Sequence, residues 1–363
     1  MPYLVLGNVF QNILHGVFDA RQSVWLPSSL YVSGEKGTWF NPSVLTGVFT
    51  DTAGTTQAVV NDPVARVNDL SGNASNATQA TLGSRPLFGR VPANGRKNLI
   101  TYSEQLDITS AWSVANVSIT PNVDGTADKM TELATTSVHY ISQNATIPAA
   151  GRCTASVEAK LSVGTRWFII RANNDGANYW IVCNLQDGTI SQVGPSVTAS
   201  SITALSDGYY SITMSWSSPA DTLSGVIFGL SNSATPGTGT PSYAGDGTSA
   251  VLIRNAQFEF GPSATAYQRV GSTYDVTQVG QDSRWYLANV STDTIEWSAV
   301  AGTYTIAYRG NTGSVILDAQ TLSGTTNVML SSKIYEYIVV QRALGSVERS
   351  RLLNYFNQKY ALV

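Results

Sequence analysis

The sequence predicts an all-β protein of the sandwich or jelly-roll type, and three observations support this prediction. Short runs in which apolar and polar residues alternate recur from Gln22 onward, as expected for β-strands with one buried face. Clusters of turn-forming residues separate these runs, for example at residues 173–176 and 186–188. Helix-like periodicity is confined to the two ends of the chain. Many short strands without helices between them favour two sheets packed face to face.

Length and charge narrow the possible function classes. The chain has 363 residues, enough for about two domains. Lys and Arg together number 21 and Asp and Glu 24, so the formal net charge is −3. This balance argues against a nucleic-acid binder, which needs a basic surface to displace counterions. Charged residues make up only 12% of the chain, against roughly 25% in an average soluble protein. A surface of uncharged polar residues is typical of extracellular or particle-borne β proteins.

The sequence indicates neither membrane insertion nor secretion. No run approaches the ~18 consecutive apolar residues of a membrane span. The first basic residue is Arg21, so no charged region precedes an apolar core as it does in a secretory signal. We therefore expect a protein that stays in the cytosol or leaves the cell by another route, such as lysis. Cys153 and Cys183 lie in strand-like runs, and we expect two buried free thiols, with a disulfide as the alternative.

Residues 3–18 predict an amphipathic helix. Its apolar residues follow the 3-4-3-4 spacing of a coiled-coil seam at Tyr3, Leu6, Phe10, Ile13 and Val17. A helix this short is marginal alone and must bury its apolar face against something. Two alternatives are open: the helix packs on its own domain, or it mediates self-association or docking into a larger assembly. Residues 1–21 are therefore assigned to a docking or oligomerisation segment.

A second helix is predicted at the C-terminus. Ser346 can cap its start, and Glu348 lies in the first turn, where a negative charge is favourable. The apolar residues that line one face of this helix are Leu352, Leu353, Phe356 and Tyr360.

Few residues could support catalysis. His15 lies in the predicted N-terminal helix, and His139 lies in a strand-like run where packing explains it better than proton transfer. Nucleophile-elbow, phosphate-loop, dinucleotide-binding and zinc-protease motifs are all missing. Acidic residues are scattered, and the sequence alone cannot show whether two carboxylates lie about 5–9 Å apart, the separation that glycoside hydrolysis requires. We therefore predict a protein that is not an enzyme.

Two segments resemble the opening and the close of a known domain type. In residues 34–88, Trp39 lies in an early strand, and an Asp-Leu-Ser-Gly-Asn turn at residues 69–73 precedes Ala77–Ala80 and Arg85-Pro86. In residues 334–362, a last strand, an Arg-Ala-Leu turn and a terminal helix follow one another. Both segments resemble the concanavalin-like (laminin-G-like) jelly rolls of bacteriophage structural proteins.

Two segments between them resemble the ends of a second module. These are residues 96–120, which begin Arg-Lys-Asn-Leu-Ile-Thr-Tyr-Ser-Glu-Gln, and residues 245–271, which end Ala-Tyr-Gln-Arg-Val-Gly. They are similar to the two ends of a carbohydrate-binding-module-like jelly roll found in phage tail proteins. The resemblance implies a nested layout, in which residues 22–97 and 272–363 form one discontinuous concanavalin-like jelly roll. Residues 98–271 form the inserted module, and surface loops tolerate such insertions.

The second resemblance directs attention to sugar and calcium binding. Sugars stack on aromatic faces, and the module contains several aromatic residues, most of them inside apolar strands where core packing explains them better. Trp112 lies in a polar stretch and is the candidate glycan contact. Modules of this shape often hold a structural calcium near their joined ends, where Glu104 and Glu259 are the corresponding candidate ligands. No other cofactor is expected.

The resemblance implies a bacteriophage virion structural protein, a tail-fibre or adhesion component that binds receptors or glycans. The expected partners are other virion proteins, further copies of this chain and a host surface glycan, but not nucleic acid or a membrane. The alternative is a head decoration or head-fibre protein with a mechanical role. A glycan-cleaving tail enzyme is a third and less favoured alternative.

Overall fold

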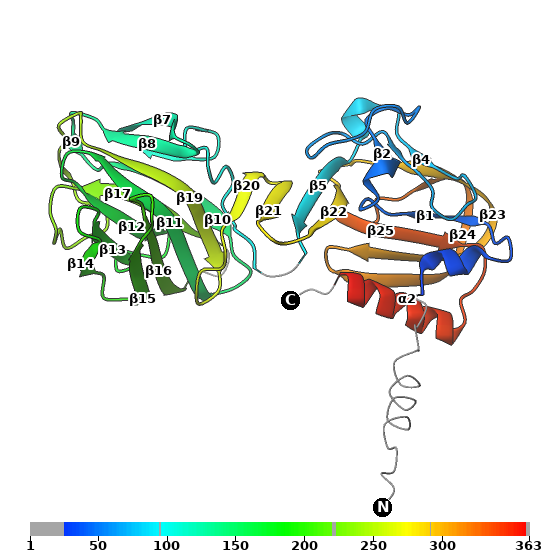
Figure 1. The fold of residues 1–363 in the computed structure, drawn as a ribbon. Helices are drawn as coiled ribbons and strands as arrows, with labels where there is room; N and C mark the ends of the chain where they lie inside the picture. The colour runs from blue at the N-terminus through cyan, green and yellow to red at the C-terminus, as the bar shows by residue number, and fades with distance from the viewer. Residues whose placement is uncertain (1–24, 94–95, 220–222, 291, 361–363) are drawn as a thin grey trace, which may run out of the picture. The chain divides into compact units, whose positions relative to one another are not determined.

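The computed structural model describes residues 25–93, 96–219, 223–290 and 292–360 (Figure 1). The predicted N-terminal helix, with Tyr3, Leu6, Phe10, Ile13 and Val17, lies outside the described residues. Strands predominate in the described part, and its one α-helix is the C-terminal α2 (Ser346–Lys359). The predictions of a mostly β fold and of a C-terminal helix are therefore confirmed. None of the described helices combines the length and apolarity that a membrane crossing requires.

By internal contacts the described chain forms two compact units. The flanking unit comprises residues 25–88 and 286–360, and the central unit comprises the residues between them, 89–285. The central unit thus interrupts the flanking unit along the chain.

Three strands late in the chain form the centre of the flanking unit. β23 (Glu296–Gly310) and β24 (Gly313–Asn327) make a long antiparallel hairpin, and β25 (Lys333–Val340) pairs with β23. Strands from residues 25–88 complete the sheet: β1 (Gly37–Phe40) pairs with β25, while β4 (Ala77–Thr78), β3 (Arg66–Val67) and β2 (Val48–Phe49) continue from β23. β22 (Ser283–Ala288) joins the start of β25. The short 3-10 helices are η1 (Pro27–Tyr31), η2 (Leu45–Gly47) and η3 (Leu82–Ser84).

The turn that carries the concanavalin-like resemblance fastens β1 in place. Asp69 accepts hydrogen bonds from the Trp39 backbone N–H at 2.9 Å and from Thr38 Oγ1 at 3.0 Å. The same carboxylate accepts from the backbone N–H groups of Ser71 and Ser75. Asp69 therefore satisfies hydrogen-bond donors of both the turn and β1, which explains why an aspartate at the start of this turn stabilises the strand.

Helix α2 packs on the flanking sheet around a buried carboxylate. Glu336 in β25 is 0% exposed and accepts hydrogen bonds from Trp39 Nε1 at 2.6 Å and from Tyr360 Oη at 2.7 Å. Lys359 Nζ of α2 lies 2.7 Å from the same group, and Tyr355 Oη donates to it. Burial, and then the Glu336 charge, raise the pKa of Tyr355. The helix thus supplies most of the donors that a buried carboxylate requires.

Two six-stranded antiparallel sheets form the central unit. The first has the order β14-β13-β12-β17-β10-β6 and the second the order β15-β16-β11-β19-β8-β7. The first sheet contains β6 (Ser113–Ala115), β10 (Tyr140–Thr146), β12 (Trp167–Asn173), β13 (Trp180–Asn184), β14 (Thr189–Val193) and β17 (Leu223–Ser231). The second contains β7 (Val117–Asp124), β8 (Ala127–Glu132), β11 (Gly151–Val163), β15 (Val197–Ala204), β16 (Tyr210–Ser218) and β19 (Ala250–Phe260).

Short elements complete the central unit. β9 (Thr136–Ser137) pairs with β18 (Tyr243–Ala244), and β20 (Gln268–Ser272) pairs with β21 (Asp275–Gln278). The end of β5 (Leu87–Pro92) pairs in parallel with β21 through Arg90 and Asp275. A 2.7 Å ion pair joins the side chains of the same two residues.

Both sheets of the central unit contribute to one apolar core. Phe168 and Ile170 enter it from β12, and Met214 and Trp216 enter it from β16. Cys153 and Cys183 are buried in the same cluster and are not disulfide-bonded, so the prediction of two buried free thiols is confirmed. Burial raises the pKa of each thiol to about 12, which leaves both protonated and unreactive at neutral pH.

Asn98 joins the two ends of the central unit. Its side chain is 4% exposed, and its Nδ2 donates to the backbone carbonyls of Ala256 and Gln268, each at 3.0 Å. Its Oδ1 accepts from the backbone N–H of Phe258 at 3.0 Å. The Asn98 backbone N–H in turn donates to Gln268 Oε1 at 2.9 Å. The first residues of the unit are therefore bonded to its last strands.

We expect residues 98–271 to fold when expressed alone, because Asn98 and Gln268 join both ends of this segment to one core. Thermal circular dichroism should show one cooperative transition, and amide NMR spectra should be dispersed. As a control, Asn98→Ala should lower the melting temperature of the fragment, since it leaves buried backbone groups without partners. A molten or insoluble fragment would show that the segment needs the rest of the chain.

Candidate functional site

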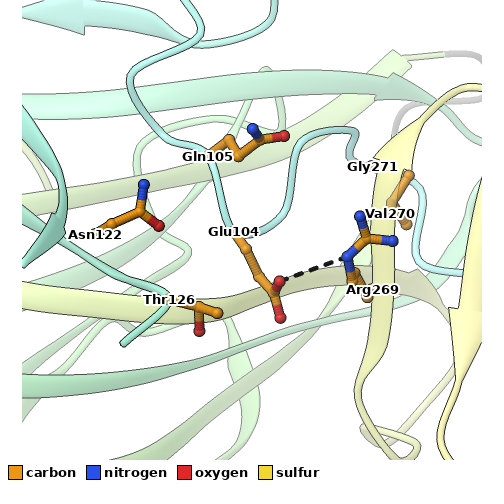
Figure 2. A pocket seen from close by; sticks show the side chains of 7 residues that line it. All are labelled: Glu104, Gln105, Asn122, Thr126, Arg269, Val270 and Gly271. Carbon is orange, nitrogen blue, oxygen red and sulfur yellow. Dashed lines mark ion pairs between the residues drawn. The ribbon is translucent and has the colours of Figure 1, made fainter. Parts of the chain in front are cut away.

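The central unit carries a polar pocket of about 190 Å³ (Figure 2). Seven residues line it: Glu104, Gln105, Asn122, Thr126, Arg269, Val270 and Gly271. Glu104 and Gln105 come from the loop that precedes β6, Asn122 and Thr126 from the β7–β8 hairpin, and the remaining three from β20. In Figure 2 the Glu104 carboxylate and the Arg269 guanidinium point toward each other across this pocket.

Ser103 anchors the Glu104 loop to β20. It is 0% exposed, and its backbone N–H donates to the Val270 carbonyl at 3.0 Å. Its Oγ accepts from the Val270 backbone N–H at 2.9 Å and lies 2.7 Å from Tyr267 Oη. Because these bonds fix the residue directly before Glu104, the carboxylate projects from a rigid backbone position.

Asp128 connects the same loop to the β7–β8 hairpin. Its carboxylate is 1% exposed and accepts from the Leu106 backbone N–H at 2.6 Å and from the Asn122 backbone N–H at 2.9 Å. Asn122 has a φ of 52°, a left-handed conformation that asparagine tolerates. Burial raises the pKa of Asp128, and the two N–H donors oppose that shift. Asp128 is thus a positioning residue for two sides of the pocket.

The charged pair at the pocket is partly open to solvent. Arg269 Nε lies 3.6 Å from Glu104 Oε2, and Arg269 Nη1 lies 3.1 Å from Asp275 Oδ2. The Arg269 side chain is 46% exposed and that of Glu104 is 19% exposed. A Cβ at Gly271 would lie 3.0 Å from Arg269 Nη2, so glycine leaves room for the guanidinium. Solvent screening keeps the stabilising contribution of such a pair small.

This arrangement is suited to binding a hydroxylated ligand. Arginine has five N–H donors; Asp275 accepts a hydrogen bond from Nη1, and Glu104 lies at ion-pair distance, 3.6 Å from Nε. The amides of Gln105 and Asn122 and the hydroxyl of Thr126 both donate and accept. Vicinal hydroxyl groups of a sugar both donate and accept hydrogen bonds, which complements this set of groups. The pocket contains no aromatic side chain among its lining residues, so binding there depends on hydrogen bonds.

The expectation that Trp112 is an exposed glycan contact is wrong. Its side chain is 1% exposed and belongs to the central core, with its ring 6.1 Å from that of Phe228. Its Nε1 donates to the Tyr102 carbonyl at 3.2 Å. The polar stretch around Trp112 is a surface turn, and the indole points from it into the core, a direction that the polarity of neighbouring residues does not reveal. Through its hydrogen bond to Tyr102, Trp112 also helps to hold the Glu104 loop in place.

The aromatic residues predicted to be core residues are buried or partly buried. Trp180 is 4% exposed and packs with Ile169 and Val182 in a small cluster on the side of β12 and β13 opposite to Phe168. Alternate side chains of these two strands therefore face two separate apolar clusters. A Cβ at Gly239 would lie 2.7 Å from Trp180 Cβ, so the loop after β17 covers this second face.

Glu104 and Glu259 do not form a calcium site together. Glu259 is 0% exposed and accepts from the Thr265 backbone N–H at 2.9 Å, from Thr265 Oγ1 at 2.6 Å and from Gln257 Nε2 at 2.9 Å. Glu104 instead faces Arg269. Within the described residues, no group of three or more His, Cys, Asp or Glu side chains is placed to hold a metal ion. The two carboxylates fasten separate loops to the strands.

His139 is a packing residue, as the sequence predicts. It is 2% exposed, its Nδ1 lies 2.8 Å from the Asn116 carbonyl, and its ring lies 4.6 Å from that of Tyr243.

Sequence reasoning missed three residues that form or position the pocket: Arg269, Asn122 and Asp128. Arg269 could have been found, because it lies in the segment that resembles the end of a carbohydrate-binding module. No local signal marks Asn122 or Asp128, whose roles arise from the fold.

No protein-family model and no curated protein matches the chain. Similar solved structures include the adhesin domain of Epf from Streptococcus pyogenes, with 11% identity over 68% of this chain and 81% of that one, at a TM-score of 0.24. The CBM22 tandem domain of Paenibacillus barcinonensis Xyn10C has 12% identity over 70% of this chain and 93% of that one, at a TM-score of 0.28. The tripod from the baseplate of bacteriophage Tuc2009 has 8% identity over 72% of this chain and 99% of that one, at a TM-score of 0.23. Likenesses this distant carry no argument about function.

We expect Trp112→Ala to destabilise the central unit by about 3–5 kcal/mol, because it leaves a large cavity in a packed core. Chemical denaturation of the full chain should show this as a lower midpoint. Trp167→Ala is the matched control, since Trp167 is only partly buried at the edge of a small cluster and its loss should cost less. Equal losses in both variants would contradict the core assignment of Trp112.

Proposed function

We propose that the protein is a bacteriophage virion component, of the tail-fibre or adhesion type, that binds glycans through the Glu104–Arg269 pocket. The observation that carries the proposal is a partly exposed guanidinium on β20 and a carboxylate on an anchored loop, surrounded by amide and hydroxyl groups. The resemblance of the chain to phage jelly-roll domains, and its mostly β fold, support the virion assignment. Release by lysis would bring such a protein to the outside of the cell.

The proposed activity is binding without chemistry. Of the seven residues that line the pocket, Glu104 is the single carboxylic acid, and its partner is Arg269 rather than a second carboxylate. Glycoside hydrolysis generally requires two carboxyl groups on opposite sides of the scissile bond. The adjacent Asp275 is occupied by Arg90 and Arg269. Binding through hydrogen bonds fits this chemistry better than cleavage.

The full layout we propose is a concanavalin-like jelly roll interrupted by a carbohydrate-binding-module-like jelly roll. The nested chain order of the two compact units supports it. The proposed partners are other virion proteins and further copies of the chain, joined through residues 1–21. Sequence supports this assembly role, since the apolar stripe of residues 3–18 needs a surface to cover it.

A glycan array probed with the full chain tests the proposed function. Glycans that bind should then be titrated calorimetrically against the full chain and its variants. We expect Arg269→Ala and Glu104→Gln each to weaken binding at least about tenfold, equal to about 1.4 kcal/mol. The melting temperature should change little, because the pair is partly exposed.

The control is Arg351→Ala, which removes an exposed cation from α2 in the flanking unit and should leave glycan affinity unchanged. Unchanged glycan affinity in both pocket variants would show that glycans bind at another site. An array without any binding glycan would favour the mechanical role of a decoration or head-fibre protein.

Deletion of residues 1–20 tests the assembly role. We expect the truncated chain to melt at the same temperature as the full chain but to be monomeric in multi-angle light scattering, because the apolar stripe is lost. A truncated chain with unchanged mass that still enters particles would contradict this role.

A further inference from the structure

The flanking unit contains a second pocket, of about 180 Å³, which shares no residue with the Glu104–Arg269 pocket. Its lining comprises Lys36, Gly37, Asn73, Ser75, Trp297, Ser298, Val300 and Tyr304. This space is smaller than the roughly 300–1,000 Å³ of pockets that enclose drug-sized ligands, so it suits a single small ring with its substituents rather than a polymer chain.

Aromatic and aliphatic groups form the floor of this second pocket. Trp297 is 3% exposed and Tyr304 is 1% exposed, and their rings meet edge to face at 6.2 Å. Tyr304 Oη donates to the Val300 carbonyl at 2.6 Å, which fixes the ring. The Val300 side chain is 61% exposed beside them. The two rings are almost fully buried and keep the wall of the pocket rigid, so the apolar surface that is open to the C–H groups of a ligand is that of Val300.

Lys36 provides one positive charge at the rim. It is exposed, and none of the ion pairs among the described residues includes it. Gly37 follows with a φ of 141°, and a Cβ there would lie 1.9 Å from the Val339 carbonyl oxygen. Only glycine allows the chain to approach β25 this closely, so the backbone that carries Lys36 is held in one position.

Asn73 and two serines add hydrogen-bonding groups. Asn73 Nδ2 donates to the carbonyls of Glu35 at 3.0 Å and Gly37 at 3.2 Å, which turns its Oδ1 away from them. No hydrogen bond among the described residues uses Asn73 Oδ1, Ser75 Oγ or Ser298 Oγ. An acceptor and two hydroxyls thus remain available around the floor, and a ligand with several hydroxyl groups would satisfy them.

The charge at this pocket favours an anion. Lys36 is the one charged residue of the lining, which contains no carboxylate. The neighbouring Asp69 is fully engaged by donors of β1 and its own turn. A phosphate is usually bound by several cations or by a cluster of backbone N–H groups, neither of which lines this pocket. A carboxylate on a hydroxylated ring matches one lysine, three polar groups and an apolar floor.

We propose that the second pocket binds an acidic sugar of the hexuronic acid class. The carboxylate pairs with Lys36 Nζ, the ring hydroxyls meet Asn73, Ser75 and Ser298, and the ring C–H face rests on the exposed side chain of Val300. The inference is independent of the glycan site in the central unit, because no residue is shared between the two pockets.

Titration of the full-length protein with methyl glucuronide, followed by ligand-observed and protein-observed NMR, tests the proposal. Methyl glucoside, which lacks the carboxylate, is the matched neutral probe. We expect glucuronide to bind about fivefold more tightly than glucoside at low salt, the size of effect that an exposed ion pair supplies. High salt should remove this preference, because the charges are screened.

Two variants locate the site. Lys36→Gln should lower glucuronide affinity to that of glucoside, and Ser298→Tyr, which fills the mouth of the pocket, should abolish binding of both. Lys129→Gln in β8 of the central unit is the control for a lost positive charge and should change nothing. Arg269→Ala should also leave glucuronide binding intact, which separates this proposal from the site in the central unit.

The proposal is overturned if glucuronide does not bind, if it binds no better than glucoside, or if Lys36→Gln and Lys129→Gln reduce its affinity equally. Should Ser298→Tyr lower the melting temperature, Ser298→Val provides the second measurement. This variant places a β-branched residue, which strands favour, at an exposed strand position and removes one hydroxyl, so it should weaken the binding of both sugars to the same extent. Unchanged binding of both sugars to a folded Ser298→Val would also count against the assignment.

Discussion

The central unit depends on the buried side chain of Asn98. Its side-chain amide donates to backbone carbonyls of β19 and β20 and accepts a hydrogen bond from a backbone N–H of β19. A segment near the start of the unit is therefore held beside strands near its end. The candidate site follows from this constraint. Ser103 and Glu104 come five and six residues after Asn98, and Arg269 comes directly after Gln268, so joining the ends also brings the charged pair together. A module closed in this way can be carried in a loop of another domain without strain.

Buried carboxylates perform much of the remaining organisation in a chain with few charges. Asp175 is 5% exposed and accepts from Trp216 Nε1 at 2.5 Å and Ser218 Oγ at 2.6 Å. Glu132 is 0% exposed and pairs with Arg166 at 2.7 Å. Glu336 has the same role beneath α2. Each group satisfies several donors from separate strands, so none of these carboxylates can be removed without leaving buried partners unpaired.

The strands and the C-terminal helix could be predicted because their periodicity is local. The apolar runs that predict strands correspond to elements such as β12 and β13. Leu352 and Phe356 are buried in α2 as expected, whereas Leu353, predicted on the same face, is 37% exposed. The site was less predictable. Trp112 was misassigned because polar neighbours in sequence do not fix the direction of a side chain in a turn. Glu104 was placed correctly near the joined ends but given the wrong partner, since its partner Arg269 lies 165 positions away along the chain and only the fold brings the two together.

The pairing of β1 with β25 has a consequence for synthesis on the ribosome. Trp39 and Glu336 lie 297 residues apart, so they meet only after the whole central unit has been made. At about 5–20 residues per second this takes about 15–60 s, during which β1 has no partner strand. The central unit carries its own closure at Asn98 and can fold during that interval. The domain that begins first along the chain is therefore completed last, and its early strands must stay soluble meanwhile, a requirement that their polar, turn-rich sequence satisfies.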